Sequence, residues 1–138
     1  MCELARRGRD LHAAADRIDT YLQPLLEATA PDLLGICGVG VDGAAMFLVT
    51  AGDNPGRLRS EAAWAHLCGV APIPASSGKT IRYANAALHR VVLCRMSGDA
   101  RTKTYVAKRR LEGKTNREII RSLERYVARE VYRHLPHR

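Results

Sequence analysis

The segment from Thr115 to Leu135 predicts a helix with a defined start and one buried face. Thr115 and Glu118 fit a capping box, in which the hydroxyl and the carboxylate each accept a hydrogen bond from the other residue's backbone N–H. The apolar residues that follow recur every three or four positions, which places them on one side of a helix. They are Ile119, Ile120, Leu123, Tyr126, Val127, Val131 and Leu135. Because such a face is stable only when it is covered, the rest of the chain must supply packing partners.

The composition favours helices as those partners. The chain has 138 residues and is 46% hydrophobic, but it contains only one Phe and one Trp. A core built mainly of Leu, Ile, Val and Ala is typical of packed helices and not of an aromatic-rich β-sandwich. No apolar run reaches membrane-spanning length, and no signal peptide follows Met1. We therefore expect an all-α protein of the cytoplasm, with no membrane partner.

The cysteines predict no metal centre. Cys2, Cys37, Cys68 and Cys94 form no C-x-x-C pair, and no histidine stands at zinc-ligand spacing. Three of them have apolar neighbours, as reduced and buried thiols of a cytosolic protein do. We expect no metal ligands in this chain.

Residues 4–29 predict a helix with a coiled-coil rhythm. Its apolar residues alternate steps of four and three, at Leu11, Ala15, Ile18, Leu22 and Leu25. Pro24 predicts a kink or break near Gln23. The helix either docks on the domain or is the stump of a longer one, and we favour the stump. The predicted division is therefore a linker helix over 1–30 and a helical domain over 31–138.

A Gly-Val-Gly turn resembles a helix-hairpin-helix motif. A short apolar helix leads into Gly38 and Gly40, and a helix of small residues leaves them and runs to about Ala51. Two glycines permit a tight turn with exposed N–H groups at a helix N-terminus, and such groups bind phosphate. The alternative is a plain αα-hairpin with a glycine turn.

Local signals predict three further helices. Ser60 is a plausible N-cap for a helix through Leu67, and Gly69 is its C-terminal stop. Trp64 on this helix is expected in the core. The next helices are expected over 84–96 and 101–111, the second capped by Asp99 and stopped by Gly113; the apolar face of the first consists of Ala84, Ala87, Leu88, Val91 and Val92.

A stiff, proline-rich loop is expected around residues 70–82. Pro72 and Pro74 fix the backbone before Ser76 and Ser77, and a glycine and a lysine follow. Such a segment either presents a nucleophilic serine or makes an ordinary turn. Its Ser-Gly-Lys-Thr ending is similar to that of a phosphate-binding P-loop, but an isoleucine stands where that motif needs its first glycine.

The charge is divided sharply along the chain. Residues 1–78 hold six Lys+Arg and nine Asp+Glu, whereas residues 79–138 hold sixteen and five. The net charge of +8 therefore comes from the second part, which predicts a polyanionic partner, most commonly nucleic acid. The alternative is a solvated basic surface without a ligand.

Arginines recur every fourth residue in the last predicted helix. They are Arg117, Arg121, Arg125, Arg129 and Arg133. Like charges at this spacing repel each other, which a helix tolerates better when an anion faces it. The competing explanation is pairing within the helix with Glu118, Glu124 and Glu130.

Several segments together resemble one known family. They include Ala-Gly-Asp-Asn-Pro, Leu-Cys-Gly-Val-Ala-Pro-Ile-Pro-Ala-Ser-Ser-Gly-Lys-Thr and Arg-Thr-Lys-Thr-Tyr. From about residue 10 onward, the chain is similar to the C-terminal domain of DEDD-type insertion-sequence transposases (the insertion sequence one-hundred-and-ten family). The resemblance implies DNA recombination, with DNA as the partner, and in some members a guide RNA. It also implies a homo-oligomer in the complete enzyme.

The resemblance implies a catalytic serine. The matching position is Ser77, with its neighbour Ser76 as the alternative. A serine needs its proton removed and needs cations to hold the charge of the transition state. Lys79 and Arg82 are close enough in sequence for the second task. Further predicted phosphate contacts are Arg117, Arg121 and Arg125 of the last predicted helix and the hairpin glycines Gly38 and Gly40.

Two departures from the family pattern predict that the chain is inactive alone. In the family, Mg²⁺ is held by an acidic RNase-H-like domain that precedes this one, and these 138 residues do not contain it. The Arg- and Gly-rich hairpin that usually follows the serine is also shortened, because Thr80 runs almost directly into the next helix. Two rival hypotheses stay open: a non-catalytic helix-hairpin-helix DNA-binding module, and a basic scaffold that docks only protein.

Overall fold

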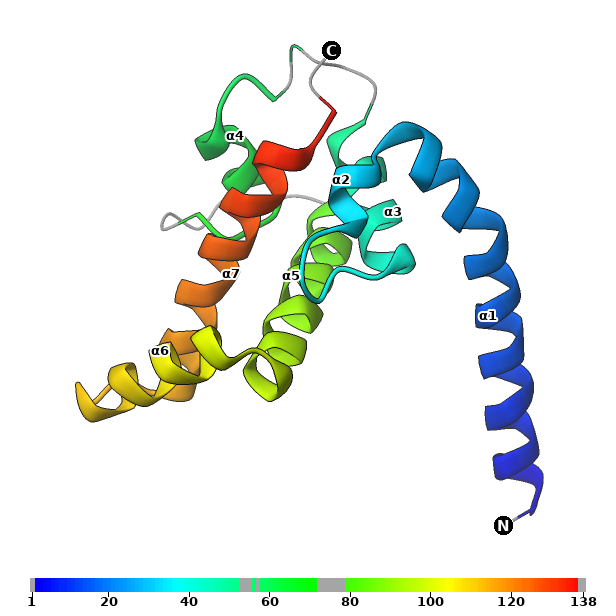
Figure 1. The fold of residues 1–138 in the computed structure, drawn as a ribbon, viewed down its shortest axis with the longest axis horizontal. Coiled ribbons are helices and arrows are strands. Elements are labelled where there is room, and N and C mark those ends of the chain that lie inside the picture. The colour runs from blue at the N-terminus through cyan, green and yellow to red at the C-terminus, as the bar shows by residue number, and fades with distance from the viewer. Residues whose placement is uncertain (1, 53–55, 57, 72–78, 137–138) are drawn as a thin grey trace.

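The computed structural model describes residues 2–52, 56, 58–71 and 79–136, with the backbone alone for residues 2 and 79–82. These residues form helices and no strand, which confirms the all-α prediction (Figure 1). The helices are α1 Cys2–Thr29, α2 Pro31–Leu34, α3 Val41–Ala51, α4 Glu61–Leu67, α5 Lys79–Gly98, α6 Ala100–Leu111 and α7 Asn116–His134.

Helix α5 is the centre of the fold. It packs against α3, α6 and α7, while α4 covers another part of α7. Its predicted apolar face is confirmed, because Leu88 is fully buried and the other four residues of that face are at most 2% exposed. Trp64 is also fully buried, as predicted, and its ring meets Phe47 edge-on at 6.3 Å between centroids.

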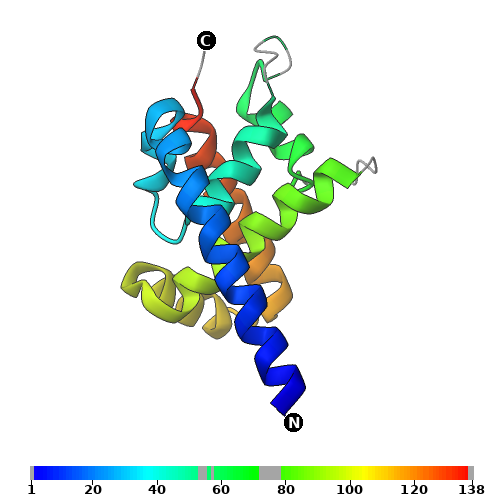
Figure 2. The same cartoon turned by 90° about the vertical axis from the view of Figure 1, so that its right-hand side faces the viewer.

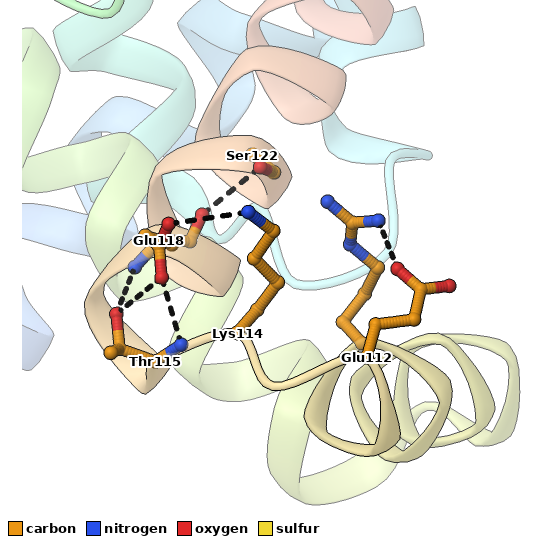
Figure 3. Close-up of polar contacts among 6 residues, drawn as sticks. Glu112, Lys114, Thr115, Glu118 and Ser122 are labelled. Carbon is orange, nitrogen blue, oxygen red and sulfur yellow. Dashed lines mark hydrogen bonds and ion pairs between the residues drawn. The ribbon is translucent and has the colours of Figure 1, made fainter.

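The helix ends follow the local signals. The capping box at Thr115 is present in both directions, and Figure 3 shows Glu118 turned back toward Thr115 while Lys114 also reaches its carboxylate. Ser60 and Asp99 cap α4 and α6 through hydrogen bonds from backbone N–H groups. Since these bonds join residues three positions apart, the sequence alone was sufficient to predict them.

Several predicted features differ from the structure. Three cysteines were expected to be buried, but Cys37 and Cys94 are exposed, and of the cysteines with described side chains Cys68 alone is buried. Helix α5 begins at Lys79 and not near residue 84, so the extended loop predicted over 70–82 ends earlier. Tyr126 was expected in the buried stripe, but it is 52% exposed. Its neighbours Leu123 and Val127 are buried, so Tyr126 marks the edge of the stripe.

Helix α1 extends away from the other helices. Its N-terminal part stands apart in Figure 1, and Figure 2 shows the same helix from its outer side. The helix is continuous through Pro24, so of the predicted kink or break the break is absent, and the kink stays a prediction. Leu11, Ile18 and Leu25 are each more than half exposed, whereas Leu22 packs against the core, so the helix docks only through its C-terminal end. The division at residue 30 stays a prediction. Among the helices described, none is both long and apolar enough to cross a bilayer.

Candidate nucleic-acid interface

Three of the predicted phosphate-binding arginines line one groove. Arg117, Arg121 and Arg125 project from α7 toward residues 69–71 and the first half of α5. The space has a volume of about 930 Å³. Its other lining residues are Asn85, His89, Ile120 and Glu124. We call it the α5–α7 groove.

The segment with the predicted nucleophiles adjoins this groove in the sequence. Ala71 lines the groove and directly precedes that segment in the sequence. Lys79, the first residue of α5, directly follows the segment. Ser76 and Ser77 lie outside the described residues, as do the side chains of Lys79 and Arg82. The roles of these four side chains therefore stay predictions.

The glutamates of α7 do not neutralise the groove arginines. Glu118 belongs to the capping box, Glu124 contacts His89, and Glu130 pairs with Arg95 of α5 at 2.8 Å. Pairing of arginines and glutamates within the helix is thus not what the structure shows. Within the described part of the chain, the three groove arginines have no ion-pair partner, and all three are exposed.

A buried carboxylate forms the floor of the groove. Glu124 is only 7% exposed, and its Oε1 lies 2.9 Å from Nδ1 of His89 on α5. A buried carboxylate is costly without a hydrogen-bond partner, so moving α5 away from α7 would leave Glu124 unsatisfied. The contact therefore favours one separation of the two helices. The pair was not predicted from the sequence, although a signal existed: Glu124 is four residues from both Ile120 and Ala128, on the buried side of the helix.

The predicted glycine hairpin is present, but its two glycines have different surroundings. Gly38 has φ +82° and packs closely on Val91 of α5, whereas Gly40 is exposed and caps α3. Asp42 in the first turn of α3 already places a carboxylate near these N–H groups, and it pairs with Arg90 at 2.6 Å. Neither glycine lines the α5–α7 groove. Phosphate binding by the hairpin stays a prediction.

The described residues do not fit a Mg²⁺ site. Across the described ranges, no three His, Cys, Asp or Glu side chains gather where they would hold a metal ion. Among the residues that line the groove, Glu124 is the carboxylate, and it already contacts His89. What the described part of this region offers chemically is positive charge in a groove that also contains Ala71, the residue that precedes the segment with Ser76 and Ser77 in the sequence.

Comparisons with known proteins identify related sequences. The family described as "Transposase IS116/IS110/IS902 family" matches residues 30–110. A curated protein of Streptomyces coelicolor (strain ATCC BAA-471 / A3(2) / M145), named "Insertion element IS110 uncharacterized 43.6 kDa protein", is 32% identical over 127 residues. That alignment covers 83% of this chain and 31% of the relative, so the chain spans about a third of the relative's length. No solved structure gives a significant match.

Proposed function

Because this chain belongs to the IS116/IS110/IS902 family of transposases, we propose that it is the DNA-binding, serine-bearing part of such a recombinase. The observation that carries the proposal is the α5–α7 groove, where three exposed arginines without described partners line the same groove as Ala71. Ala71 directly precedes, in the sequence, the segment that contains Ser77. The family indicates transposition in general terms, and the groove indicates where this chain would hold its substrate.

The spacing of the arginines suits a phosphate backbone. Arg117, Arg121 and Arg125 are four residues apart, so the helix advances about 6 Å from one to the next. Phosphates of one DNA strand follow each other at about 3.4 Å along the helix axis. The row therefore extends over a few consecutive phosphates, and an anion there relieves the repulsion between the arginines. Contacts of this kind position DNA without reading its sequence.

We assign the nucleophile to Ser77, with Ser76 as the alternative. Attack of the serine oxygen on a DNA phosphodiester would form a phosphoserine bond and release the other strand end as a hydroxyl. Lys79 and Arg82 would stabilise the charge on the phosphorus oxygens. We further propose that the chain transfers no strand by itself, because the metal-binding carboxylates implied by the resemblance belong to another domain. A guide RNA and a homo-oligomer belong to the same proposal for the complete enzyme.

Salt dependence tests the DNA-binding part of the proposal. A triple variant with Arg117, Arg121 and Arg125 changed to Gln should bind duplex DNA more weakly, and the slope of log K against log salt should fall by about 2.7, at about 0.9 per lost contact. The matched control changes Arg6, Arg7 and Arg9 of α1 to Gln, which removes the same charge far from the groove. Equal losses in both variants would show general charge attraction, and no salt dependence at all would favour the protein-docking scaffold.

A covalent-adduct assay tests the serine. The purified chain with Mg²⁺ and DNA should form no adduct, and an adduct there would refute inactivity alone. Together with the acidic domain of a family member, the chain should form one, and Ser77→Ala should abolish it while leaving DNA affinity nearly unchanged. If Ser77→Ala has no effect on an adduct and Ser76→Ala removes it, the nucleophile is Ser76. If neither serine matters, the chain is a non-catalytic hairpin module.

A further inference from the structure

A small notch between α6 and α7 combines aromatic rings with positive charge. We call it the tyrosine notch. Its lining residues are Tyr105, Lys108 and Arg109 of α6, Glu112 at the end of α6, and Ser122, Arg125, Tyr126 and Arg129 of α7. Its volume of about 360 Å³ lies within the range of about 300–1,000 Å³ that is usual for small-ligand sites. The α5–α7 groove shares only Arg125 with it.

The two tyrosines form an aromatic surface at the edge of the core, against which Tyr105 packs. Their rings meet edge to face, with centroids 5.9 Å apart and planes at 86°. Tyr105 is half-buried and has the guanidinium of Arg109 over its ring, at 5.9 Å from the centroid. Tyr126 is 52% exposed. The pair thus holds the Tyr126 ring in a fixed orientation while leaving half of that residue open to a ligand.

Two of the four cations around the rings are not neutralised. Arg109 pairs with Glu112, and Arg129 donates to Glu61. Lys108 and Arg125 have no ion-pair partner in the described ranges of the chain. An aromatic surface flanked by unpaired cations is complementary to a nucleotide, which has a planar base and a negative phosphate.

We propose that the tyrosine notch binds an unpaired nucleotide, with the base stacked on Tyr126 and the phosphates contacting Lys108 and Arg125. Bases inside a duplex are stacked on each other and present no ring face, so the ligand is a single-stranded segment of DNA or RNA. The site is distinct from the duplex contacts proposed for the groove, and the shared Arg125 makes the two surfaces continuous.

Affinity for a short single strand measures this directly. Fluorescence anisotropy of a labelled hexanucleotide should show that Tyr126→Ala weakens binding about 5- to 150-fold, the range found for losing one base–aromatic stack. Tyr126→Phe keeps the ring and should bind as wild type does. Tyr21→Ala is the matched control, because Tyr21 is 76% exposed on α1 and lies outside the notch.

An abasic strand of the same length separates stacking from effects on the fold. It carries the same phosphates without bases, so Tyr126→Ala should not weaken its binding. The proposal is overturned if Tyr126→Ala binds the normal strand as tightly as wild type, or if it loses as much affinity for the abasic strand. Parallel titrations with DNA and RNA hexamers tell which source of the nucleotide is preferred. If Tyr126-dependent single-strand binding occurs without duplex binding, the notch stands and the groove proposal fails.

Discussion

Changing Gly38 to Ala should destabilise the protein measurably. Gly38 has φ +82°, and an L-residue in this left-handed region costs about 1–2 kcal/mol. An added Cβ would also lie 3.3 Å from the carbonyl oxygen of Val91 and 3.4 Å from its Cγ1. The oxygen belongs to the backbone of α5 and cannot move aside easily. We expect a total loss of about 1–3 kcal/mol, a large share of the about 5–15 kcal/mol typical of a domain.

The matched control is Gly43→Ala, five residues further along the same hairpin. Gly43 lies inside α3 without a positive φ, and its added Cβ would make an ordinary contact of 3.7 Å with Val39. Alanine is favoured over glycine inside a helix by about 0.5–1 kcal/mol, so this variant should be slightly more stable than wild type. The two glycine-to-alanine variants should therefore change the free energy of unfolding in opposite directions.

Urea unfolding monitored by tryptophan fluorescence provides the assay. Trp64 is the sole tryptophan and is fully buried, so its emission reports the loss of the core. With a slope of about 1–3 kcal/mol per molar urea, the Gly38→Ala midpoint should fall by about 1 M. The reasoning is refuted if Gly38→Ala unfolds at the wild-type urea concentration, or if Gly43→Ala loses as much stability.

Three further outcomes follow from the described contacts. The side-chain hydrogen bond from Thr102 lowers the pKa of Asp99, and the backbone N–H of Thr115 lowers that of Glu118. Both contributions to stability are complete above the ordinary carboxyl pKa of about 4 and are lost as the pH falls through the lower pKa values of the folded state. The double variant Asp99→Asn with Glu118→Gln should therefore lose less stability than wild type as the pH falls. An unchanged acid limb in a stability-against-pH profile would contradict this. Burial raises the pKa of the Cys68 thiol, whereas Cys37 and Cys94 are exposed. Peptide mapping after brief treatment with a thiol reagent should therefore find label on the two exposed cysteines and on Cys68 only after unfolding, and equal labelling rates would be the contrary result. His89→Ala should destabilise the protein by about 1–3 kcal/mol because it leaves Glu124 buried without its partner, and a chemical-denaturation midpoint equal to that of wild type would rule this out.

The sequence predicted the features that depend on near neighbours. The caps at Ser60, Asp99 and Thr115 and the buried position of Trp64 follow from short-range spacing, and the structure confirms them. The resemblance to the transposase family is likewise confirmed, because it rests on segments that can be compared directly.

The features that the sequence did not predict depend on how helices cross. Tyr126 contacts Tyr105 of α6 but stays 52% exposed, and no local pattern predicts how much of α7 the neighbouring helix covers. His89 and Glu124 are 35 residues apart, so their contact exists only once α5 lies on α7. For the same reason, the grouping of Arg117, Arg121 and Arg125 beside residues 69–71 needed the structure, although each arginine was named from its spacing.

Arg95 gives the two candidate phosphate-binding parts a common anchor. Its Nε donates to the carbonyl oxygen of Cys37 at 2.7 Å, next to the hairpin, and its other arm holds Glu130 of α7 at 2.8 Å. One largely buried side chain thus sets the separation between the hairpin and the arginine-bearing helix. A nucleic acid that contacts both parts must place its phosphates at this fixed separation. The protein would then select a ligand by the shape of its sugar-phosphate backbone and not by its base sequence.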